Sequence, residues 1–389
     1  MKDEATIGKA ADMVKDIYER GLRPVVVVSA LKGTTDNLLN LAKKIDPATP
    51  DELMDQILSM GERTSARIFA VALKSKGLEP VLVDPEFENW PIITDDRHLD
   101  ANPIYKETEE AVQRKIQPLL DDGKTPVVCG FIGKTQKGEL TTLGRGGSDT
   151  TGLILGSCLK SREIVLVKDV ETIFSSDPDV VENPVPIQTL NSEEAYLLSS
   201  GGAKFLHSKA LSYNRSGVRI RIASLESGGR SGTIIDGGAL DLVVEQSPDP
   251  VTMVTIIAEK ALDAEQIRSL MMGVTEAGGN ILSLTLDPKS TILYVVHGTS
   301  LADRLHKLVI GNKLGKALSF FENLRMVIIK GPALETAPGM IQRVTQPLAR
   351  SNINVFGLVT ISSSIRIFVS KDKADAAVEM LRAALLALK

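Results

Sequence analysis

The sequence predicts an α/β domain with a mainly parallel sheet, followed by two smaller α+β units. Short apolar runs at 24–28, 125–133 and 163–167 are typical of buried parallel strands, and helical apolar patterns alternate with them. Further on, Ala277-Gly-Gly-Asn280-Ile281 and Ala349-Arg-Ser-Asn352-Ile353 repeat at an offset of 352 − 280 = 72 residues. The 389 residues are enough for two or three domains.

Composition limits the classes of partner. The 45 basic and 49 acidic residues give a net charge of −4, and no basic run is present, which argues against a nucleic-acid partner. Cys129 and Cys158 lack CxxC spacing and lie in apolar contexts, so we expect free thiols in a reducing compartment. No apolar run is long enough to span a bilayer, and the first residues do not read as a signal peptide. We therefore expect a cytoplasmic protein with no membrane partner.

The first strand ends in a loop rich in hydroxyl groups. An amphipathic helix over 7–20 precedes the strand at 24–28, the loop spans 29–36 with Ser29, Thr34 and Thr35, and a helix over 37–44 follows. Ligands of open α/β sheets bind beyond the carboxyl ends of the strands, where this loop would lie. A plain turn with a helix N-cap is the alternative.

A long helix over 51–77 contains Gly61 and Glu62 in its middle. A helical glycine costs about 1 kcal/mol relative to alanine, so it indicates close approach of a backbone or ligand. Glu62 is then a site candidate, and a solvated glutamate is the alternative. A strand at 78–83 and a polar loop over 84–102 follow. The loop is either a lid or a surface excursion.

A glycine-rich turn over 141–149 lies between the strand at 125–133 and a helix over 150–159. Backbone N–H groups and the helix N-terminus favour an anion here, and Arg145 can hold a carboxylate or phosphate through two parallel hydrogen bonds. Asp149 adds a carboxylate that can cap the helix or orient a metal-bound phosphate. A purely structural turn is the competing interpretation.

Charged residues follow the buried strand at 163–167, beginning with Lys168 and Asp169, which again indicates a site. A helix over 193–200, capped by Asn191 or Ser192, and a half-exposed strand at 218–223 complete a domain of residues 1–236. A linker over 237–250 leads to units at 251–322 and 323–389. Each unit is expected to run strand, helix, strand, strand, helix, strand, with its helices on one side of an antiparallel sheet. His297 and His306 are isolated there, and no catalytic cluster is apparent.

In order, these motifs resemble the aspartate kinases of the amino acid kinase family followed by two ACT domains. The resemblance covers almost the whole chain. It is carried by Ser29-Ala with Thr34-Thr35, Gly61-Glu62, Thr-Leu-Gly144-Arg-Gly-Gly-Ser-Asp149, Lys168-Asp169 with Asp177-Pro178, and Gly202-Ala-Lys204-Phe-Leu-His207. It implies a three-layer sandwich and transfer of the ATP γ-phosphoryl group to the β-carboxylate of L-aspartate, the first step of lysine, threonine and methionine biosynthesis. Such a reaction depends on positioning and charge neutralisation.

The resemblance also implies roles for individual residues. The aspartate-binding residues would be Thr35, Glu62, Arg145 and Ser148, with Glu62 facing the amino group and Arg145 a carboxylate. The catalytic residues would be Asp149 and Lys204. The nucleotide site would comprise Lys168, Asp169, Phe174, Asp177 and Lys204. Mg²⁺ would accompany ATP, held by phosphates and water, so no metal-ligating residue is expected.

The ACT units imply feedback regulation by lysine or threonine. Candidate effector contacts are Gly339, Met340, Ser362 and Ser364. Two ACT units per chain also imply a homodimer or higher homo-oligomer. A role limited to holding the oligomer together is the alternative.

A second function stays open at this stage. The family begins with a strand and a Lys-Phe-Gly-Gly-Thr-Ser loop, whereas Met1 here falls where the first helix should begin. We therefore also expect either a truncated kinase or a noncatalytic ACT-containing amino-acid sensor or regulatory subunit derived from an aspartate kinase. Phe174 stands in place of the family's usual tyrosine, which affects the nucleotide contacts.

Overall fold

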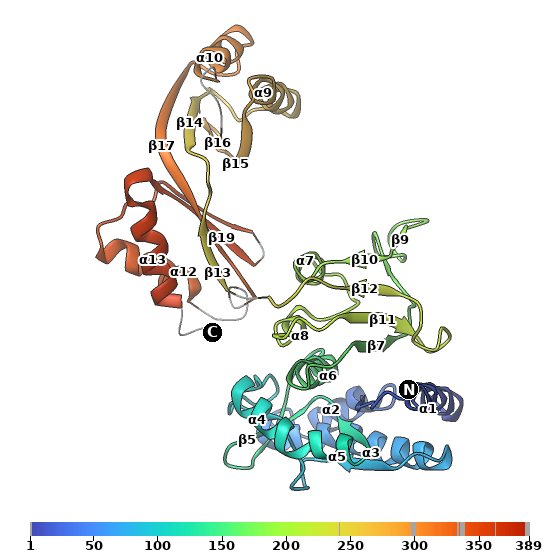
Figure 1. Cartoon of the computed structure of the whole chain (residues 1–389). Coiled ribbons are helices and arrows are strands. Elements are labelled where there is room, and N and C mark those ends of the chain that lie inside the picture. The colour runs from blue at the N-terminus through green and yellow to red at the C-terminus, as the bar shows by residue number, and fades with distance from the viewer. Residues whose placement is uncertain are drawn as a thin grey trace. The chain divides into compact units, whose positions relative to one another are not determined.

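The computed structural model describes residues 2–240, 242–296, 301–332, 334, 339–361 and 363–385. The chain divides into two compact units, Met1–Leu240 and Asp241–Lys389. Helices and strands alternate through the first unit, and a large antiparallel sheet dominates the second (Figure 1).

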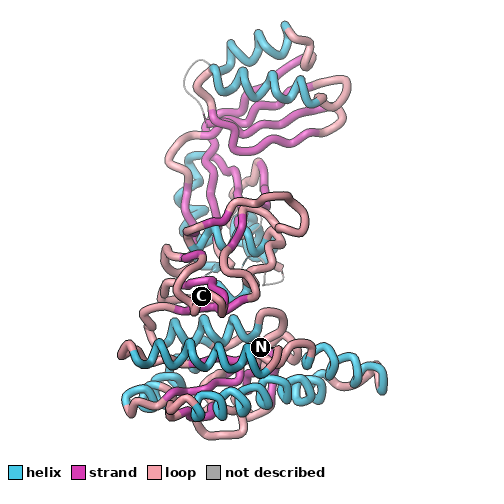
Figure 2. The backbone as a smooth tube through the Cα atoms, turned by 90° about the vertical axis from the view of Figure 1, so that its right-hand side faces the viewer, coloured by secondary structure: helices cyan, strands magenta, loops and turns pink. Residues whose placement is uncertain are grey.

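The first half of unit 1 contains a three-stranded parallel sheet in the order β1-β4-β2. Its strands are β1 (Val26–Val28), β2 (Pro80–Val83) and β4 (Thr125–Cys129). All five residues of β4 are buried, as expected for a central parallel strand. The surrounding helices are α1 (Glu4–Glu19), α2 (Thr34–Ile45), α3 (Asp51–Ser75), α4 (Tyr105–Lys115) and α5 (Gln117–Asp121). Figure 2 shows strands of this unit lying between helices.

The second half of unit 1 contains a four-stranded sheet in the order β10-β12-β11-β7, in which β7 and β11 are parallel. Its strands are β7 (Ile164–Lys168), β10 (Thr189–Leu190), β11 (Ile220–Ser224) and β12 (Thr233–Ile235). The helices of this half are α6 (Gly147–Cys158), α7 (Ser192–Ser200) and α8 (Ser208–Leu211). Helix α6 packs against both β1 and β7 and so connects the two sheets.

Three local expectations for unit 1 were wrong. Helix α2 begins at Thr34, so Thr34 and Thr35 lie in its first turn and not in a loop. Four of the five β11 residues are buried, so this strand is not half-exposed. The segment 84–102 contains β3 (Ile93–Thr94), and its Trp90 and Ile92 are buried. Strand β3 joins β5 (Ile132–Thr135) and β6 (Leu140–Thr142) in a small sheet, and β8 (Ile173–Phe174) pairs with β9 (Pro186–Ile187).

The first half of unit 2 has the expected antiparallel α+β arrangement, with sheet order β15-β16-β14-β17. Its elements are β14 (Val251–Ile257), α9 (Ala264–Glu276), β15 (Asn280–Leu286), β16 (Ser290–Val296), α10 (Leu301–Gly311) and β17 (Ala317–Lys330). Apolar residues of α9 and α10 pack on one face of these strands and form one core with them.

The second half of unit 2 differs from the expected element order. It contains the second part of β17, α12 (Met340–Arg350), β18 (Gly357–Ile361), β19 (Ser364–Ser370) and α13 (Ala374–Leu385). The remaining edge strand is β13 (Val243–Gln246), which pairs with Val327–Lys330 of β17. Val244 belongs to the same core as α12 and α13. A strand from the predicted linker therefore completes this half of the sheet.

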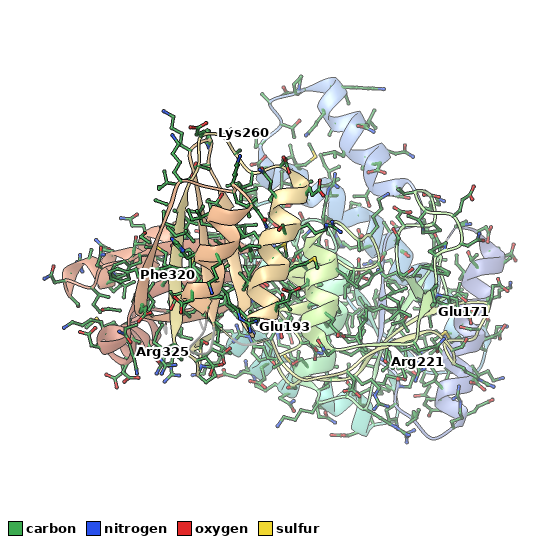
Figure 3. The ribbon with its side chains drawn as sticks, turned by 90° about the horizontal axis from the view of Figure 1, so that it is seen from above. Glu171, Glu193, Arg221, Lys260, Phe320 and Arg325 are labelled. Carbon is green, nitrogen blue, oxygen red and sulfur yellow. The ribbon has the colours of Figure 1, made fainter. Side chains whose placement is uncertain are left out.

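The two halves share the 14-residue strand β17, whose first and second parts contain Phe320 and Arg325, labelled in Figure 3. Their helix-free faces pack together, because Tyr294 of β16 stacks on Phe368 of β19 with ring centroids 3.8 Å apart. The Tyr294 hydroxyl also donates to the Phe356 carbonyl at 2.8 Å. Unit 2 is thus one continuous sheet with two α+β halves.

Candidate active site

Glu62 lies where β1 ends. It is on α3, and its Oε1 accepts a hydrogen bond of 3.1 Å from the backbone N–H of Ala30, two residues beyond β1. A Cβ on the preceding Gly61 would lie 2.9 Å from the Ala30 Cβ, closer than carbon atoms pack. The glycine therefore allows α3 to approach this loop, as its position within the helix predicted.

The Glu62 carboxylate is buried and only partly satisfied. The residue is 4% exposed, and its Oε2 has no hydrogen-bond partner among the described residues. Burial raises the pKa of Glu62 from 4.5 to about 7. The buried hydroxyl of Ser65, one turn further along α3, also lacks a partner. Because a carboxylate oxygen and a hydroxyl both accept hydrogen bonds, this position suits a ligand with N–H donors and positive charge.

Thr35 lies close to the same point. It is half-buried in the first turn of α2, and its Oγ1 is 3.9 Å from where a Cβ on Gly61 would be. Thr35 and Glu62 thus belong to adjacent parts of two helices. Since α2 has no buried residue, this end of the site is bordered by a loosely packed helix.

The glycine-rich loop brings Ser148 to the same strand ends. Gly144 and Gly146 have φ of 73° and 71°, left-handed values that glycine adopts readily, and α6 then starts at Gly147. A Cβ on Gly130, just after β4, would lie 2.8 Å from the Ser148 Oγ and 2.9 Å from the Val28 carbonyl oxygen. Ser148 therefore rests directly on the ends of β1 and β4.

Arg145 is exposed at the tip of this loop. No ion pair within the described part of the chain involves its guanidinium. The N–H groups of the first α6 turn and the positive end of the helix lie immediately after it. The loop thus offers a free cation beside a helix N-terminus, which favours carboxylate or phosphate.

Asp149 and Lys168 form a half-buried ion pair. The Lys168 Nζ lies 2.8 Å and 2.6 Å from the two carboxylate oxygens of Asp149. Asp149 is in the first turn of α6, and Lys168 is the last residue of β7. Asp169 follows and is exposed. Lys168, at the end of β7, therefore contacts the first turn of α6, the helix that follows the glycine-rich loop.

Lys204 and Asp177 form a second, more exposed pair, with 3.3 Å between Nζ and Oδ2. The backbone N–H of Asp179 and then Lys204 lower the pKa of Asp177. The Lys204 side chain is 81% exposed, so its ammonium is accessible to a ligand. Phe174 lies in β8, half-buried. The segment that contains Lys204 and His207 approaches the glycine-rich loop, because a Cβ on Gly146 would be 2.5 Å from the His207 Cβ.

The structure therefore gathers the site candidates into three groups. Thr35, Glu62 and Ser148 surround the ends of β1 and β4, with Arg145 in the adjoining loop. Asp149 and Lys168 pair at the end of β7. Asp177 and Lys204 pair separately. Asp169 is exposed and Phe174 is half-buried, and within the described residues neither side chain bonds to either ion pair.

The effector candidates lie in the second half of unit 2. Gly339 has a φ of 77° and precedes α12, whose first residue, Met340, is buried. Ser364 starts β19 opposite Lys330 of β17, and its hydroxyl donates to the Ile361 carbonyl at 3.0 Å. Ser362 lies outside the described residues.

Several polar residues near the site were missed by the sequence analysis. Asp55 and Lys209 are buried and hydrogen-bonded close to the glycine-rich loop. Asp84 is buried and pairs with Arg63 and Arg67 of α3 at 3.1 Å and 2.7 Å. One signal existed for Asp55: it precedes Glu62 by seven residues, so both carboxylates lie on one face of a helix.

The described residues contain neither a metal-binding cluster nor a helix that could span a membrane. Within the described residues, no group of three or more His, Cys, Asp or Glu side chains has an arrangement that could hold a metal ion. In the same part of the chain, every helix is too short or too polar to cross a bilayer.

Comparison with known proteins shows which families the sequence matches. Residues 1–224 match the model of the amino acid kinase family, and residues 320–383 match that of an ACT domain. An aspartokinase of Geobacillus stearothermophilus is 30% identical, and the match covers 92% of this chain and 87% of that protein.

Two solved structures have similar folds. The aspartate kinase of Synechocystis has a TM-score of 0.75 at 23% identity, and the match covers 97% of this chain and 66% of the other. E. coli aspartokinase III, with aspartate and ADP, has a TM-score of 0.55 at 22% identity, covering 98% and 96% of the two chains. The same E. coli enzyme with lysine and aspartate has a TM-score of 0.52 at 22% identity, and the match covers 96% of each chain.

Proposed function

Because this chain belongs to the amino acid kinase family and is an aspartokinase with ACT regulation, we propose specific roles for its residues in that reaction. The reaction moves the ATP γ-phosphoryl group to the β-carboxylate of L-aspartate and gives 4-phospho-L-aspartate. The observation that carries the assignment is that the site holds both a buried, half-satisfied Glu62 carboxylate and, in the adjoining loop, the free guanidinium of Arg145. The ammonium and carboxylate groups of an amino acid complement these two charges, and the family of the chain identifies that amino acid as aspartate.

In this proposal Glu62 receives the ammonium group of aspartate on its unpartnered Oε2. Arg145 binds a carboxylate of aspartate through two parallel hydrogen bonds, and the hydroxyls of Thr35 and Ser148 bind beside it. The buried Glu62 also excludes water from one side of the substrate, which strengthens each charge interaction there.

ATP binds on the other side of the glycine-rich loop. Lys204 acts as a phosphate clamp, and Lys168, Asp169, Phe174 and Asp177 line the nucleotide site. The Lys168–Asp149 pair keeps a cation and a carboxylate at the start of α6, so Asp149 can orient the reacting groups. Mg²⁺ enters with ATP, bound by phosphates and water.

We assign catalysis to residues 1–236 and regulation to ACT units at 251–322 and 323–389. The second regulatory unit also takes β13 from the linker at 237–250. The effector is lysine or threonine, and the lysine held by E. coli aspartokinase III supports the former. Gly339, Met340, Ser362 and Ser364 are its candidate contacts.

We further propose that the chain forms a homodimer or higher oligomer. We expect it to work in the cytoplasm, in the synthesis of lysine, threonine and methionine. Its two buried free cysteines suit that compartment.

The experiment that tests the activity is hydroxylamine trapping of aspartyl phosphate with the full chain, Mg-ATP and L-aspartate. We expect aspartate-dependent hydroxamate, and suppression by lysine or threonine identifies the effector. Folded protein that forms no hydroxamate would refute catalysis by this polypeptide.

A further inference from the structure

Asp55 is a buried carboxylate that the proposed reaction does not use. It lies on α3 two turns before Glu62 and has no exposed surface. Its two oxygens receive a hydrogen bond of 2.6 Å from the Thr142 hydroxyl and bonds of 3.1 Å and 3.3 Å from the Leu99 N–H. The His98 Nδ1 is 2.7 Å away as well. One side chain thus joins α3, the segment around residue 99 and the strand that leads into the glycine-rich loop.

The segment 95–102 is a closed loop with a strained tip. Asp95 closes its neck by accepting hydrogen bonds of 2.9 Å from both the backbone and the side-chain nitrogen of Asn102. Leu99 at the tip has a φ of 64°, a left-handed conformation that is unfavourable for a residue with a Cβ. Such a conformation persists only where surrounding contacts determine it. Its N–H bonds to Asp55 are those contacts.

Lys209 holds the other side of this tip. It is 8% exposed and lies in α8. Its ammonium donates to the Asp100 carboxylate at 2.6 Å, the Ala101 carbonyl at 3.1 Å and the Leu143 carbonyl at 3.3 Å. All three of its N–H donors therefore have acceptors, one of which belongs to the glycine-rich loop.

The tip itself rests on the glycine-rich loop. The Ala101 N–H donates to the Thr142 carbonyl at 2.9 Å. A Cβ on Gly144 would lie 2.7 Å from the Asp100 Oδ1 and 3.3 Å from the Leu99 carbonyl oxygen, and its φ of 73° also favours glycine. Residues 142–144 are consequently held by hydrogen bonds on two sides, from Thr142 to Asp55 of α3 and from Lys209 of α8 to the Leu143 carbonyl. Arg145 is the next residue of the chain.

We propose that Asp55 and Lys209, acting through residues 98–101, form a clamp that sets the position of the glycine-rich loop. The inference rests on the proposed function, because the clamp prepares Arg145 and Ser148 to bind aspartate. Asp55 also fixes this loop to the helix that carries Glu62. Lys209 fixes it to the helix that follows Lys204. Both are positioning residues, since neither is assigned a contact with substrate.

The test compares Lys209→Met, Lys209→Arg and Asp100→Asn in the hydroxamate assay, with KM for aspartate and for ATP measured separately. We expect Lys209→Met and Asp100→Asn to raise the KM for aspartate at least tenfold and the KM for ATP less than threefold. Lys209→Arg keeps a cation opposite Asp100 and restores most of the affinity. Asp100 has a 58% exposed side chain, so its variant folds even where the buried Lys209→Met does not.

Arg97→Ala is the matched control, since Arg97 lies 3.8 Å from Asp100 but is itself exposed and outside the clamp. It should leave both KM values unchanged. Unaltered aspartate KM in Asp100→Asn, or equal defects in Lys209→Arg and Lys209→Met, would overturn the clamp. A wild-type chain that makes no hydroxamate would instead overturn the proposed function.

Discussion

Glu62 accepts the Ala30 N–H on one carboxylate oxygen at 3.1 Å and keeps its second oxygen without a partner within the described residues. The bond fixes the carboxylate at the carboxyl end of β1, while burial makes ionisation costly. A ligand with a cationic group would donate a hydrogen bond to the unpartnered Oε2 and favour the ionised form of Glu62. The charge of Glu62 should therefore depend on both pH and substrate.

The affinity for aspartate should increase with pH up to about 7, the pKa to which burial raises Glu62. Below that pH the carboxyl is neutral and does not attract an ammonium group. We expect the KM for aspartate to rise by up to about tenfold for each unit that the pH falls below 7. Glu62→Gln should have a high KM with little pH dependence between 5 and 8. An unchanged pH profile in that variant would contradict the role of Glu62.

In the absence of aspartate, the free energy of unfolding should fall as the pH rises, opposite to the affinity for aspartate. The folded-state pKa of Glu62, about 7, lies above the ordinary value of 4.5. Its contribution is fully present below pH 4.5 and is lost as the pH rises through 7. Glu62→Gln should therefore be more stable than the wild type at pH 8, by about 3 kcal/mol at most, with no gain at pH 4. Urea unfolding at the two pH values measures this difference.

Arg145→Ala should lose aspartate binding and keep the fold. The side chain is exposed, so its removal leaves no cavity. Hydrogen bonds to charged groups are worth about 1.5–3 kcal/mol, which corresponds to a roughly 10- to 100-fold rise in the KM for aspartate. Arg162→Ala, which removes another exposed arginine from the same unit, serves as the control. Calorimetric titration with an unchanged aspartate affinity would remove Arg145 from the site.

Lys204→Met should chiefly weaken the response to ATP. Its pair with Asp177 is exposed and contributes little to stability, so the melting temperature should stay constant. We expect a KM for ATP at least tenfold higher and a nearly normal KM for aspartate. Lys137→Met, in the turn between β5 and β6, is the matched control. A normal ATP dependence would exclude Lys204 as a phosphate ligand.

Gly130→Ala should damage both stability and activity. Its Cβ would lie 2.8 Å from Ser148 and 2.9 Å from the Val28 carbonyl oxygen, which belongs to the backbone and cannot rotate away. Overpacking of this kind costs about 1–3 kcal/mol. Gly8→Ala is the comparison, since a Cβ in that part of α1 meets no atom within 4 Å and should stabilise the helix. Denaturant midpoints and the KM for aspartate separate the two effects.

Much of unit 1 was predictable because its longer strands are short apolar runs and the glycine-rich turn lies between a strand and a helix. The two-residue strands β3, β8, β9 and β10 carry too little pattern to be predicted. The segment 84–102 was misjudged because its polar residues bond to one another, as Asp95 does with Asn102, while Trp90 and Ile92 turn inward.

The residues that surround the site were harder to predict than those in it. Asp55 reads as an ordinary acidic residue near a helix start, where such residues are common. Its partners His98 and Thr142 are 43 and 87 residues away in sequence. Apart from the seven-residue spacing to Glu62, no local pattern distinguishes this buried carboxylate from a solvated one. Thr35, Glu62, Arg145 and Ser148 were identifiable because they belong to contiguous motifs; their roles stay predictions.

Strand β13 has a consequence for how the regulatory region can be divided. The chain adds an edge strand to the second half of the sheet, then builds the whole first half, and only afterwards returns to finish the second. One half is therefore nested inside the other. A single cut between the repeats leaves β13 without its partner in β17, so neither fragment is complete. For a chimaeric enzyme with altered regulation, the piece to exchange is the whole of unit 2, Asp241–Lys389.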